Sequence, residues 1–352
     1  MPRYNIAALD DKDIFVGVDV HLKQWHVTIR TREEELFTGS IPSNWSSLKR
    51  LLHHYNPACT KVVYEAGYFG YSLSDSITSW GGQAVVTPPS LLPMEYGNRV
   101  KTDKRDSRKL AFLLSRDFLR SNWVPDMEQR GHRQVLRRRC QLLGDRVRLQ
   151  NRIKSELMFY GIDITGRVGR WSRRWVDELW LIPLGNSYAE ASFHRLLETY
   201  IYVRNQVAEQ TRLLRKLSHH ERYQGPYQSL QSIPGIGFIT SMTLLLELGD
   251  ITRFTQANKL AAYVGLTPSQ YSSGEHVRMG RITRVGKGYL RGLLVEASWI
   301  AIGRDPELQE VYRSILARSG SKRAIVAVAR RLLFRCRRVL LDKRPYEIRQ
   351  VA

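Results

Sequence analysis

The sequence predicts an α/β domain over residues 1–125, a basic helical segment with coiled-coil character over 126–225, and a mainly α-helical domain over 226–352. Three observations support this division. Runs of β-branched residues alternate with helical spacing in the first part, arginines on a helical pattern dominate the second, and apolar helical runs fill the third. A chain of 352 residues is long enough for two or three domains with cores of their own.

The first part has strands and helices in alternation. Segments rich in β-branched residues are predicted as strands, and these are 13–20, 25–31, 35–41, 60–67 and 83–88. Segments with helical spacing follow the third, fourth and fifth strands, at 43–55, 69–80 and about 101–120. The first of these helices begins with Ser43 as the expected capping residue. The first three strands lie close enough in sequence to pair as a meander.

The middle part is strongly basic and helical. Residues 130–154 hold nine lysines and arginines, among them Arg137, Arg138 and Arg139, and a single acid, Asp145. A helix with so large an excess of positive charge is typical of a nucleic-acid-binding face. Further along, apolar residues recur at three- and four-residue steps, at Phe193, Leu196, Tyr200, Val203, Val207, Leu214 and Leu217. An intramolecular hairpin and an intermolecular coiled coil are both compatible with this seam, and we expect a homo-oligomer.

The third part begins with a turn and an apolar helix over 232–250. Further helices are predicted over 255–266, 288–303 and 321–341. Between the helices at 255–266 and 288–303, the glycine- and serine-rich stretch "GLTPSQYSSGEHVRMGRITRVGKG" is predicted as a loop.

Composition restricts the class of partner. Fifty-five lysines and arginines against 33 acids give a net charge of +22, which predicts binding to a polyanion. A membrane protein is disfavoured, because no apolar run approaches the roughly 20 residues of a spanning helix. The three cysteines are far apart and form neither a disulfide framework nor a metal motif. The sequence begins with no signal-peptide pattern. We therefore expect a cytoplasmic, nucleic-acid-binding protein.

Four acids in the first part are candidate metal ligands. Asp19 and Glu65 lie at the ends of apolar strands, where a charge is costly to bury unless it is paired or used. Asp103 and Asp106 are three residues apart on a predicted helix and so share a face. If the strands are neighbours and the helix crosses their ends, the four carboxylates converge. Such a cluster favours divalent cations, with Mg²⁺ the best match to oxygen ligands.

Each of these acids also has a simpler explanation. Asp19 is placed to cap a turn, and Glu65 precedes Ala-Gly and suits a turn residue. Asp103 and Asp106 lie among lysines and arginines, as they would on a solvated helix face with salt bridges. The joint placement on two strands and one helix is what favours the metal site.

The motifs that contain these acids resemble a known family. "VGVDVHLKQWHV", "YEAGYFGY" and "VKTDKRDSRKLA" are similar to the DEDD motifs of the insertion-sequence transposases that include the Piv DNA invertases. The resemblance covers roughly residues 14–115 and implies an RNase H-like domain similar to the RuvC Holliday-junction resolvase. The predicted order of strands and helices is compatible with that fold.

The C-terminal part resembles the same family's second transposase domain, in "SIPGIGFITS", "LAAYVGLTPSQYSSG" and "GRITRVGKGYLR". The serine before the glycine is the family's nucleophile, which corresponds to Ser273. The resemblance further implies a phosphoserine link to DNA, a structured non-coding guide RNA (bridge RNA) and a tetramer. From the residues alone, Ser272 is an equally placed hydroxyl, and Glu275 and His276 are candidate bases. A tyrosine recombinase acting through Tyr271 lacks a matching Arg/His set.

Cations around this serine are expected to hold DNA phosphates, and these are Arg278, Arg281, Arg284 and Lys287. The sequence therefore predicts a metal-dependent DNA transposase or recombinase. Three alternatives stay open: a site-specific invertase with the same chemistry, a junction nuclease that uses water, and a non-catalytic nucleic-acid-binding protein.

Overall fold

The computed structural model describes residues 12–67, 69–89, 92, 103–165, 171–273, 276–283 and 285–348. For Asp103 and for residues 271–273 and 276–279, the structure describes the backbone but not the side chains. Two compact units make up the chain, Met1–Pro125 and Asp126–Ala352. The finer, three-part division stays a prediction.

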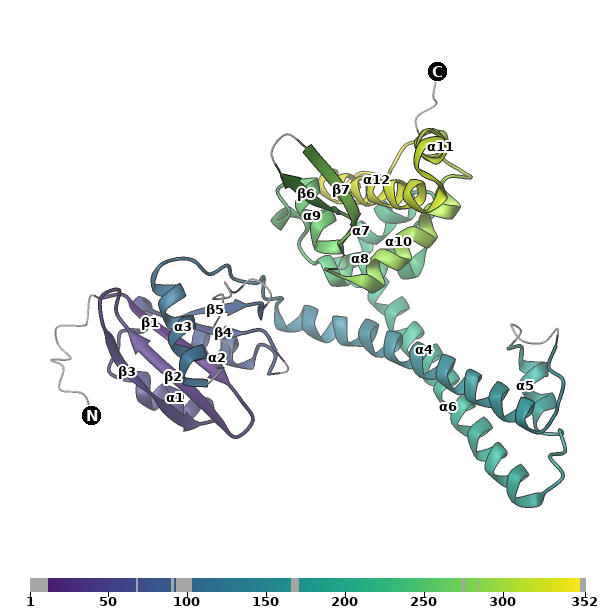
Figure 1. Cartoon of the computed structure of the whole chain (residues 1–352), viewed down its shortest axis with the longest axis horizontal. Coiled ribbons are helices and arrows are strands. Elements are labelled where there is room, and N and C mark those ends of the chain that lie inside the picture. Colours follow the sequence, from purple (N-terminus) through teal and green to yellow (C-terminus); the bar gives the residue numbers. More distant parts are fainter. Residues whose placement is uncertain are drawn as a thin grey trace. The chain divides into compact units, whose positions relative to one another are not determined.

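The first unit contains a five-stranded mixed sheet in the order β3-β2-β1-β4-β5 (Figure 1). Its strands are β1 (Ile14–Val20), β2 (Gln24–Arg30), β3 (Glu35–Pro42), β4 (Thr60–Glu65) and β5 (Gln83–Thr87). The first three form an antiparallel meander, because their connections are too short for a crossover. β4 and β5 run parallel to β1, each after a helical connection. This mixed α/β architecture is compatible with the predicted RNase H-like fold.

Helices cover both faces of this sheet. α1 (Trp45–Leu52) and α2 (Ser72–Trp80) bury leucines and isoleucine against the strand residues that face them, such as Val16 and Val27. α3 (Asp103–Ser115) packs on the opposite face, where Leu110 and Leu114 meet Phe15. The cap of α1 is Asn44 rather than the expected Ser43, since the Asn44 side chain accepts a hydrogen bond from the Ser47 amide. A short 3-10 turn at Pro57–Cys59 leads into β4.

The second unit begins with two long helices that lie side by side, α4 (Met127–Phe159) and α6 (Ser187–Ser218) (Figure 1). The seam of α6 is buried within this chain: Phe193, Tyr200 and Val203 share a core with Leu149 and Ile153 of α4. The short helix α5 (Arg173–Leu179) adds Trp175 and Leu179 to that core. The intramolecular packing is therefore observed, and an additional coiled coil between copies stays a prediction.

The remainder of the second unit is mostly helical around one large core. Its elements are α7 (Glu221–Gln231), α8 (Phe238–Leu248), a 3-10 turn at Ile251–Arg253, α9 (Ala257–Val264), β6 (Pro268–Ser273), β7 (His276–Ile282), α10 (Gly288–Ala301), α11 (Pro306–Ser319) and α12 (Ser321–Asp342). Among the described residues, no helix is long and apolar enough to cross a lipid bilayer.

One prediction for this region is wrong. The stretch that contains the serines was expected to be a loop, but it forms an antiparallel hairpin of β6 and β7. Tyr271 pairs with Arg278, and Ser272 pairs with Val277. Cross-strand pairing decides this outcome, because strand formation depends on a partner and on the context around it more than on local composition.

Candidate active site

Asp19 and Glu65 lie at the same edge and on the same face of the sheet. β1 and β4 are parallel neighbours in which Val18 is opposite Tyr64, so the next residues, Asp19 and Glu65, are at the same level. Phe15 and Val63 face α3, and side chains two residues apart in a strand point to the same face. Asp19 and Glu65 therefore both face α3 at the carboxyl ends of their strands.

The direction of α3 brings its N-terminal end to that edge. Leu110 and Leu114 pack near Phe15 at the start of β1, whereas Ser107 contacts His26, the residue that pairs with Asp19. The helix thus runs antiparallel to β1, and the half-buried Asp106 belongs to the end of the helix nearest Asp19. Asp103 is the first residue of α3, and its side chain is outside the described residues.

A hydrogen-bonded contact fixes α3 in this register. The Ser107 hydroxyl is 2.9 Å from His26 Nδ1 and 2.9 Å from Thr28 Oγ1, and Thr28 Oγ1 is 3.0 Å from Thr38 Oγ1. Ser107 and Thr28 are almost fully buried, where such bonds are costly to break. The sequence does not reveal this set of contacts, apart from the two-residue spacing that puts His26 and Thr28 on the same face of β2.

Asp19 itself is mostly shielded, with 17% of its side chain exposed, and its Oδ2 is 3.2 Å from His21 Nε2. Asp19, Glu65 and Asp106 belong to the same edge, and their negative charges need cations nearby, which Lys104 and Arg105 of α3 or a bound metal ion can supply. Carboxylate oxygens are the ligands that hard divalent cations prefer. One more feature fits an ion here: the buried hydroxyl of Thr87, which is paired in register with Glu65, has no hydrogen-bond partner among the described residues. The carboxylate chemistry of this edge therefore suits a divalent ion, and a metal site here stays a prediction.

Ser273 is the last residue of β6 and pairs with His276 of β7. Its side chain, like that of Arg278, is outside the described residues, as is the whole of Arg284. Arg281 of β7 is exposed. The nucleophile and these phosphate contacts stay predictions.

Several of the predicted DNA-binding cations make contacts within the chain. Arg137 is bound to Glu247 through two hydrogen bonds of 3.0 and 3.3 Å, and Lys287 lies 3.4 Å from the same carboxylate. Arg139 donates to the Thr211 hydroxyl at 2.9 Å. Arg138 is exposed, and within the described part of the chain it hydrogen-bonds only to the Gln141 amide oxygen, at 3.5 Å. Arg138 is therefore better placed for phosphate contacts than Arg137, although the role of each residue stays a prediction.

Glu247 is a buried carboxylate, with 7% exposure. Burial acts to raise its pKa, but the hydrogen bond from Arg137 and the charges of Lys287, Arg137 and Arg133 outweigh burial and leave the pKa lowered. Glu247 is therefore ionised at neutral pH and ties α8 to α4 and to the start of α10.

A second polar cluster joins the starts of α4 and α7. Arg222 binds both oxygens of Asp126, at 3.0 and 2.6 Å, and donates to Glu128 at 2.8 Å. His220 Nε2 lies 3.5 Å from the other oxygen of Glu128, and Tyr223 contacts His132 at 3.0 Å. Glu128, His132 and His220 are close enough together to suit a metal ion. Because Arg222 already neutralises this group, we interpret it as an ion-paired clasp between the two helices.

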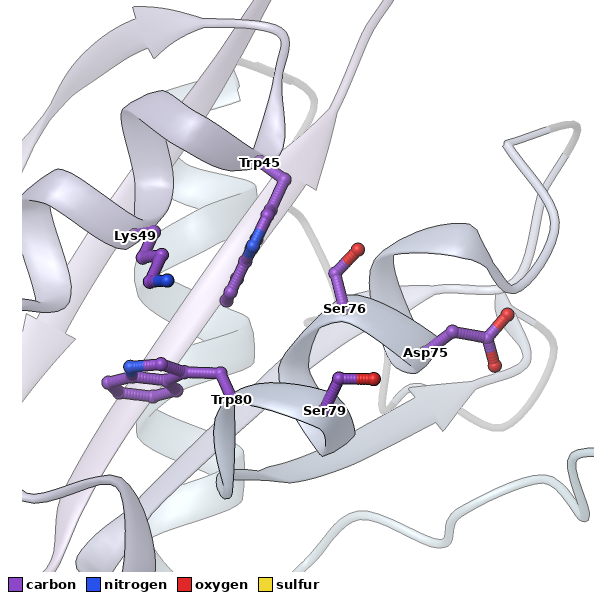
Figure 2. A pocket seen from close by; sticks show the side chains of 6 residues that line it. All are labelled: Trp45, Lys49, Asp75, Ser76, Ser79 and Trp80. Atoms are coloured by element: carbon purple, nitrogen blue, oxygen red, sulfur yellow. The ribbon is translucent and has the colours of Figure 1, made fainter.

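The first unit also has a surface cavity of about 290 Å³ between α1 and α2 (Figure 2). It is lined by Trp45, Lys49, Asp75, Ser76, Ser79 and Trp80. The two indole rings meet edge to face, 6.2 Å apart, and cover the side of the core formed by α1 and α2. This is the face of the sheet opposite Asp19 and Glu65, so the cavity is separate from the carboxylate site.

Two family models match this chain. The DEDD transposase domain of IS110-type elements matches residues 16–162, and the transposase domain of the IS116/IS110/IS902 family matches residues 227–313. The first match contains all four acids, and the second contains the hairpin with Ser273. A DEDD transposase domain implies a divalent metal.

Full-length relatives are similar over most of the chain. A putative transposase, y4qE, of Sinorhizobium fredii is 27% identical over 83% of this chain and 73% of its own length. The transposase for insertion sequence element IS1111A of Coxiella burnetii is 27% identical over 70% of this chain and 67% of its own length. The pilin gene-inverting protein of Moraxella bovis is 25% identical over 84% of this chain and 85% of its own length. The chain thus carries both transposase domains of the IS110/IS116 type of insertion-sequence transposase, the DEDD domain and the second transposase domain.

Proposed function

We propose that this protein cleaves and exchanges DNA strands through a covalent phosphoserine intermediate. Asp19, Glu65, Asp103 and Asp106 hold Mg²⁺, and Ser273 is the attacking group. The observation that carries the proposal is the placement of Asp19 and Glu65 at one edge of the sheet, with α3 starting at that same edge. The family match over the hairpin supports the role of Ser273.

The roles follow from elementary chemistry. A serine hydroxyl is a poor nucleophile until its proton is removed. Divalent ions on a carboxylate cluster supply this activation and stabilise the charge on the attacking and leaving oxygens of a phosphoryl transfer. Ser273 Oγ forms a new ester bond to phosphorus, and one DNA end leaves as a hydroxyl. Because the ester preserves the energy of the phosphodiester, rejoining to another strand needs no other cofactor.

The decisive experiment is a search for protein–DNA adducts after denaturation. The native protein and the Ser272→Ala control are expected to form Mg²⁺-dependent adducts with element-end DNA, and Ser273→Ala is expected to form none. Asp19→Ala is expected to keep its DNA affinity while losing cleavage. Cleavage by Ser273→Ala without an adduct would show a water-dependent nuclease. Binding without any cleavage by the native protein would show a non-catalytic binding protein.

We further propose that a structured non-coding RNA guides the choice of DNA and that the active form is an oligomer of this chain, a dimer or a tetramer. The net charge of +22 and the basic α4 support an additional polyanionic partner. Sequencing of co-purified nucleic acid is expected to return one discrete RNA encoded beside the gene. A broad sample of cellular RNA would contradict guidance, and a monomeric mass for the DNA-bound form would contradict the oligomer.

A site-specific invertase is the second candidate, because similarity to the pilin gene-inverting protein of Moraxella bovis extends over 84% of this chain. Transposition and inversion use the same strand chemistry and differ in the arrangement of the DNA sites. A plasmid with two recognition sites in inverted order distinguishes them. Reversal of the intervening segment favours inversion, and excision or insertion of the element favours transposition.

A further inference from the structure

Thr87, the last residue of β5, has an unusual side chain. It is fully buried, and its hydroxyl makes no hydrogen bond with any described residue. Within the described part of the chain, it is the only hydroxyl in this condition. Other buried hydroxyls of the first unit are paired, such as Thr60 with the Asn56 carbonyl at 2.8 Å and Ser115 with the Phe112 carbonyl at 2.8 Å. An unpaired buried hydroxyl destabilises the folded protein, because it loses its hydrogen bonds to water and gains none in return, so a valine of the same shape would suit the metal-free fold better.

The position of Thr87 connects it with the carboxylate site. Thr87 pairs with Glu65 in the parallel register of β4 and β5, and neighbouring strands are about 4.8 Å apart. Val85 and Val63 both face α3, so Thr87 and Glu65, each two residues further along, face α3 as well. The orphan hydroxyl therefore lies beside a proposed metal ligand, at the same edge of the sheet as Asp19.

Metal coordination would provide the missing partner. Carboxylates that bind metals are themselves usually hydrogen-bonded, and such outer contacts orient the ligand. Mg²⁺ also keeps several of its waters, and their hydrogens need acceptors. A threonine hydroxyl both donates and accepts. The Thr87 hydroxyl therefore suits the surroundings of a metal ion in a way that a valine would not.

We propose that Thr87 is a positioning residue of the metal site: its hydroxyl bonds to the oxygen ligands of the divalent ion beside Glu65, either the carboxylate or a coordinated water. This inference rests on the proposed role of Glu65 as a metal ligand. It assigns to the hydroxyl a function in holding the ion, and it explains why the fold keeps a buried polar group that it does not pair.

The test compares three variants of the full chain, all made with Ser273→Ala so that no chemistry occurs. Thr87→Val removes the hydroxyl and keeps the shape, and Thr87→Ser keeps the hydroxyl. Thr60→Val removes an equally buried but paired hydroxyl at the other end of the sheet. Mn²⁺ and Mg²⁺ affinities are measured by titration calorimetry, and stability is measured by urea unfolding in chelator.

The two measurements should move in opposite directions for Thr87→Val. Without metal it should be at least as stable as its parent, because an unpaired hydroxyl is gone. Its metal affinity should fall about tenfold, the usual loss when an outer contact of a metal ligand is removed. Thr87→Ser should keep the parental affinity. Thr60→Val should lose stability and bind metal normally, which separates the site from general damage to the fold.

The outcomes separate this inference from the proposed function. If Thr87→Val binds metal as its parent does, the inference is wrong and the metal site stands. If the parent shows no metal binding that depends on Asp19 and Glu65, the proposed function fails. Should Thr87→Val fail to fold, Thr87→Ala deletes the same hydroxyl without added bulk and must show the same loss of affinity; normal affinity there overturns the inference.

Discussion

Gly17 is the residue at which α3 comes closest to the sheet. A Cβ added there would lie 2.5 Å from the Ala111 amide nitrogen and closer still to the Ser107 carbonyl oxygen. These are backbone atoms of α3, so they cannot move aside without shifting the helix that begins at Asp103. Only glycine therefore allows α3 to lie directly on β1, two residues from Asp19.

We predict that Gly17→Ala lowers the free energy of unfolding by about 1–3 kcal/mol, the usual range for an overpacked core, and also weakens metal binding by displacing α3. Urea unfolding and Mn²⁺ titration measure the two effects. Gly67→Ala is the matched control, because a Cβ at Gly67 meets nothing within 4 Å. Equal stability of the two variants would contradict the close packing of α3 on β1.

At the scale of single residues, the sequence indicates the candidate metal ligands better than the residues that hold them in place. Asp19 and Glu65 could be predicted because a charged residue at the end of an apolar strand is a local signal. Thr87 and Ser107 could not, because their importance arises from contacts with residues distant in sequence: Ser107 meets His26 across 81 positions. Only the pairing order of the strands and the register of α3 reveal such contacts.

Among the elements, the clasp between α4 and α7 has a predictable pH dependence. The hydrogen bond from Arg222 lowers the pKa of Asp126 to about 2, below the usual value of about 3.9 in an unfolded chain. A carboxylate whose pKa is lower in the folded than in the unfolded chain stabilises the folded protein at any pH above its unfolded-state pKa. This stabilisation is lost as the pH falls towards its folded-state pKa. The clasp should therefore hold at neutral pH and fail in acid, between about pH 4 and pH 2.

The test is Asp126→Asn. Asparagine caps a helix as well as aspartate does, so this change keeps the cap of α4 and removes the charge that binds Arg222. We expect the native protein to be more stable than the variant at pH 7, with the difference shrinking below about pH 4 in urea unfolding. Asp250→Asn changes a cap whose carboxylate forms no ion pair within the described part of the chain, and it should show a smaller difference. If the native protein stays more stable than Asp126→Asn by the same amount down to pH 2, the ion pair with Arg222 is not the cause.

Element boundaries were predictable where a pattern was long and regular, and less so elsewhere. The strands of the first unit and the seam of α6 follow from alternation and from three- and four-residue steps. α7 was missed because it contains Gly225 and Pro226, which normally end a helix. Burial of Tyr223 and Leu230 offsets that cost. The hairpin of β6 and β7 was missed because its strands are polar and stabilise each other only by pairing.

For the whole molecule, the dominant property is a charge of +22, which should make nucleic-acid binding strongly dependent on salt. Each phosphate contact adds about one unit to the slope of log affinity against log salt concentration. Contacts within the fold decide which lysines and arginines are free to bind phosphates and so contribute to this slope. Arg138 is exposed on α4, whereas its neighbour Arg137 is held by Glu247.

Replacing Arg137 and Arg138 one at a time with alanine tests whether the exposed arginine binds phosphate while the arginine held by Glu247 does not. Arg138→Ala is expected to lower the salt slope by about one unit and leave stability unchanged. Arg137→Ala is expected to keep most of the slope but to lower the free energy of unfolding by about 1–3 kcal/mol, because the buried Glu247 loses its main hydrogen-bond donor. Fluorescence anisotropy with a labelled duplex between about 50 and 200 mM salt gives the slopes, and urea unfolding gives the stabilities. If Arg137→Ala lowers the slope and spares the fold, then Glu247 releases Arg137 when DNA binds, and the basic surface of α4 is larger than the unbound structure indicates.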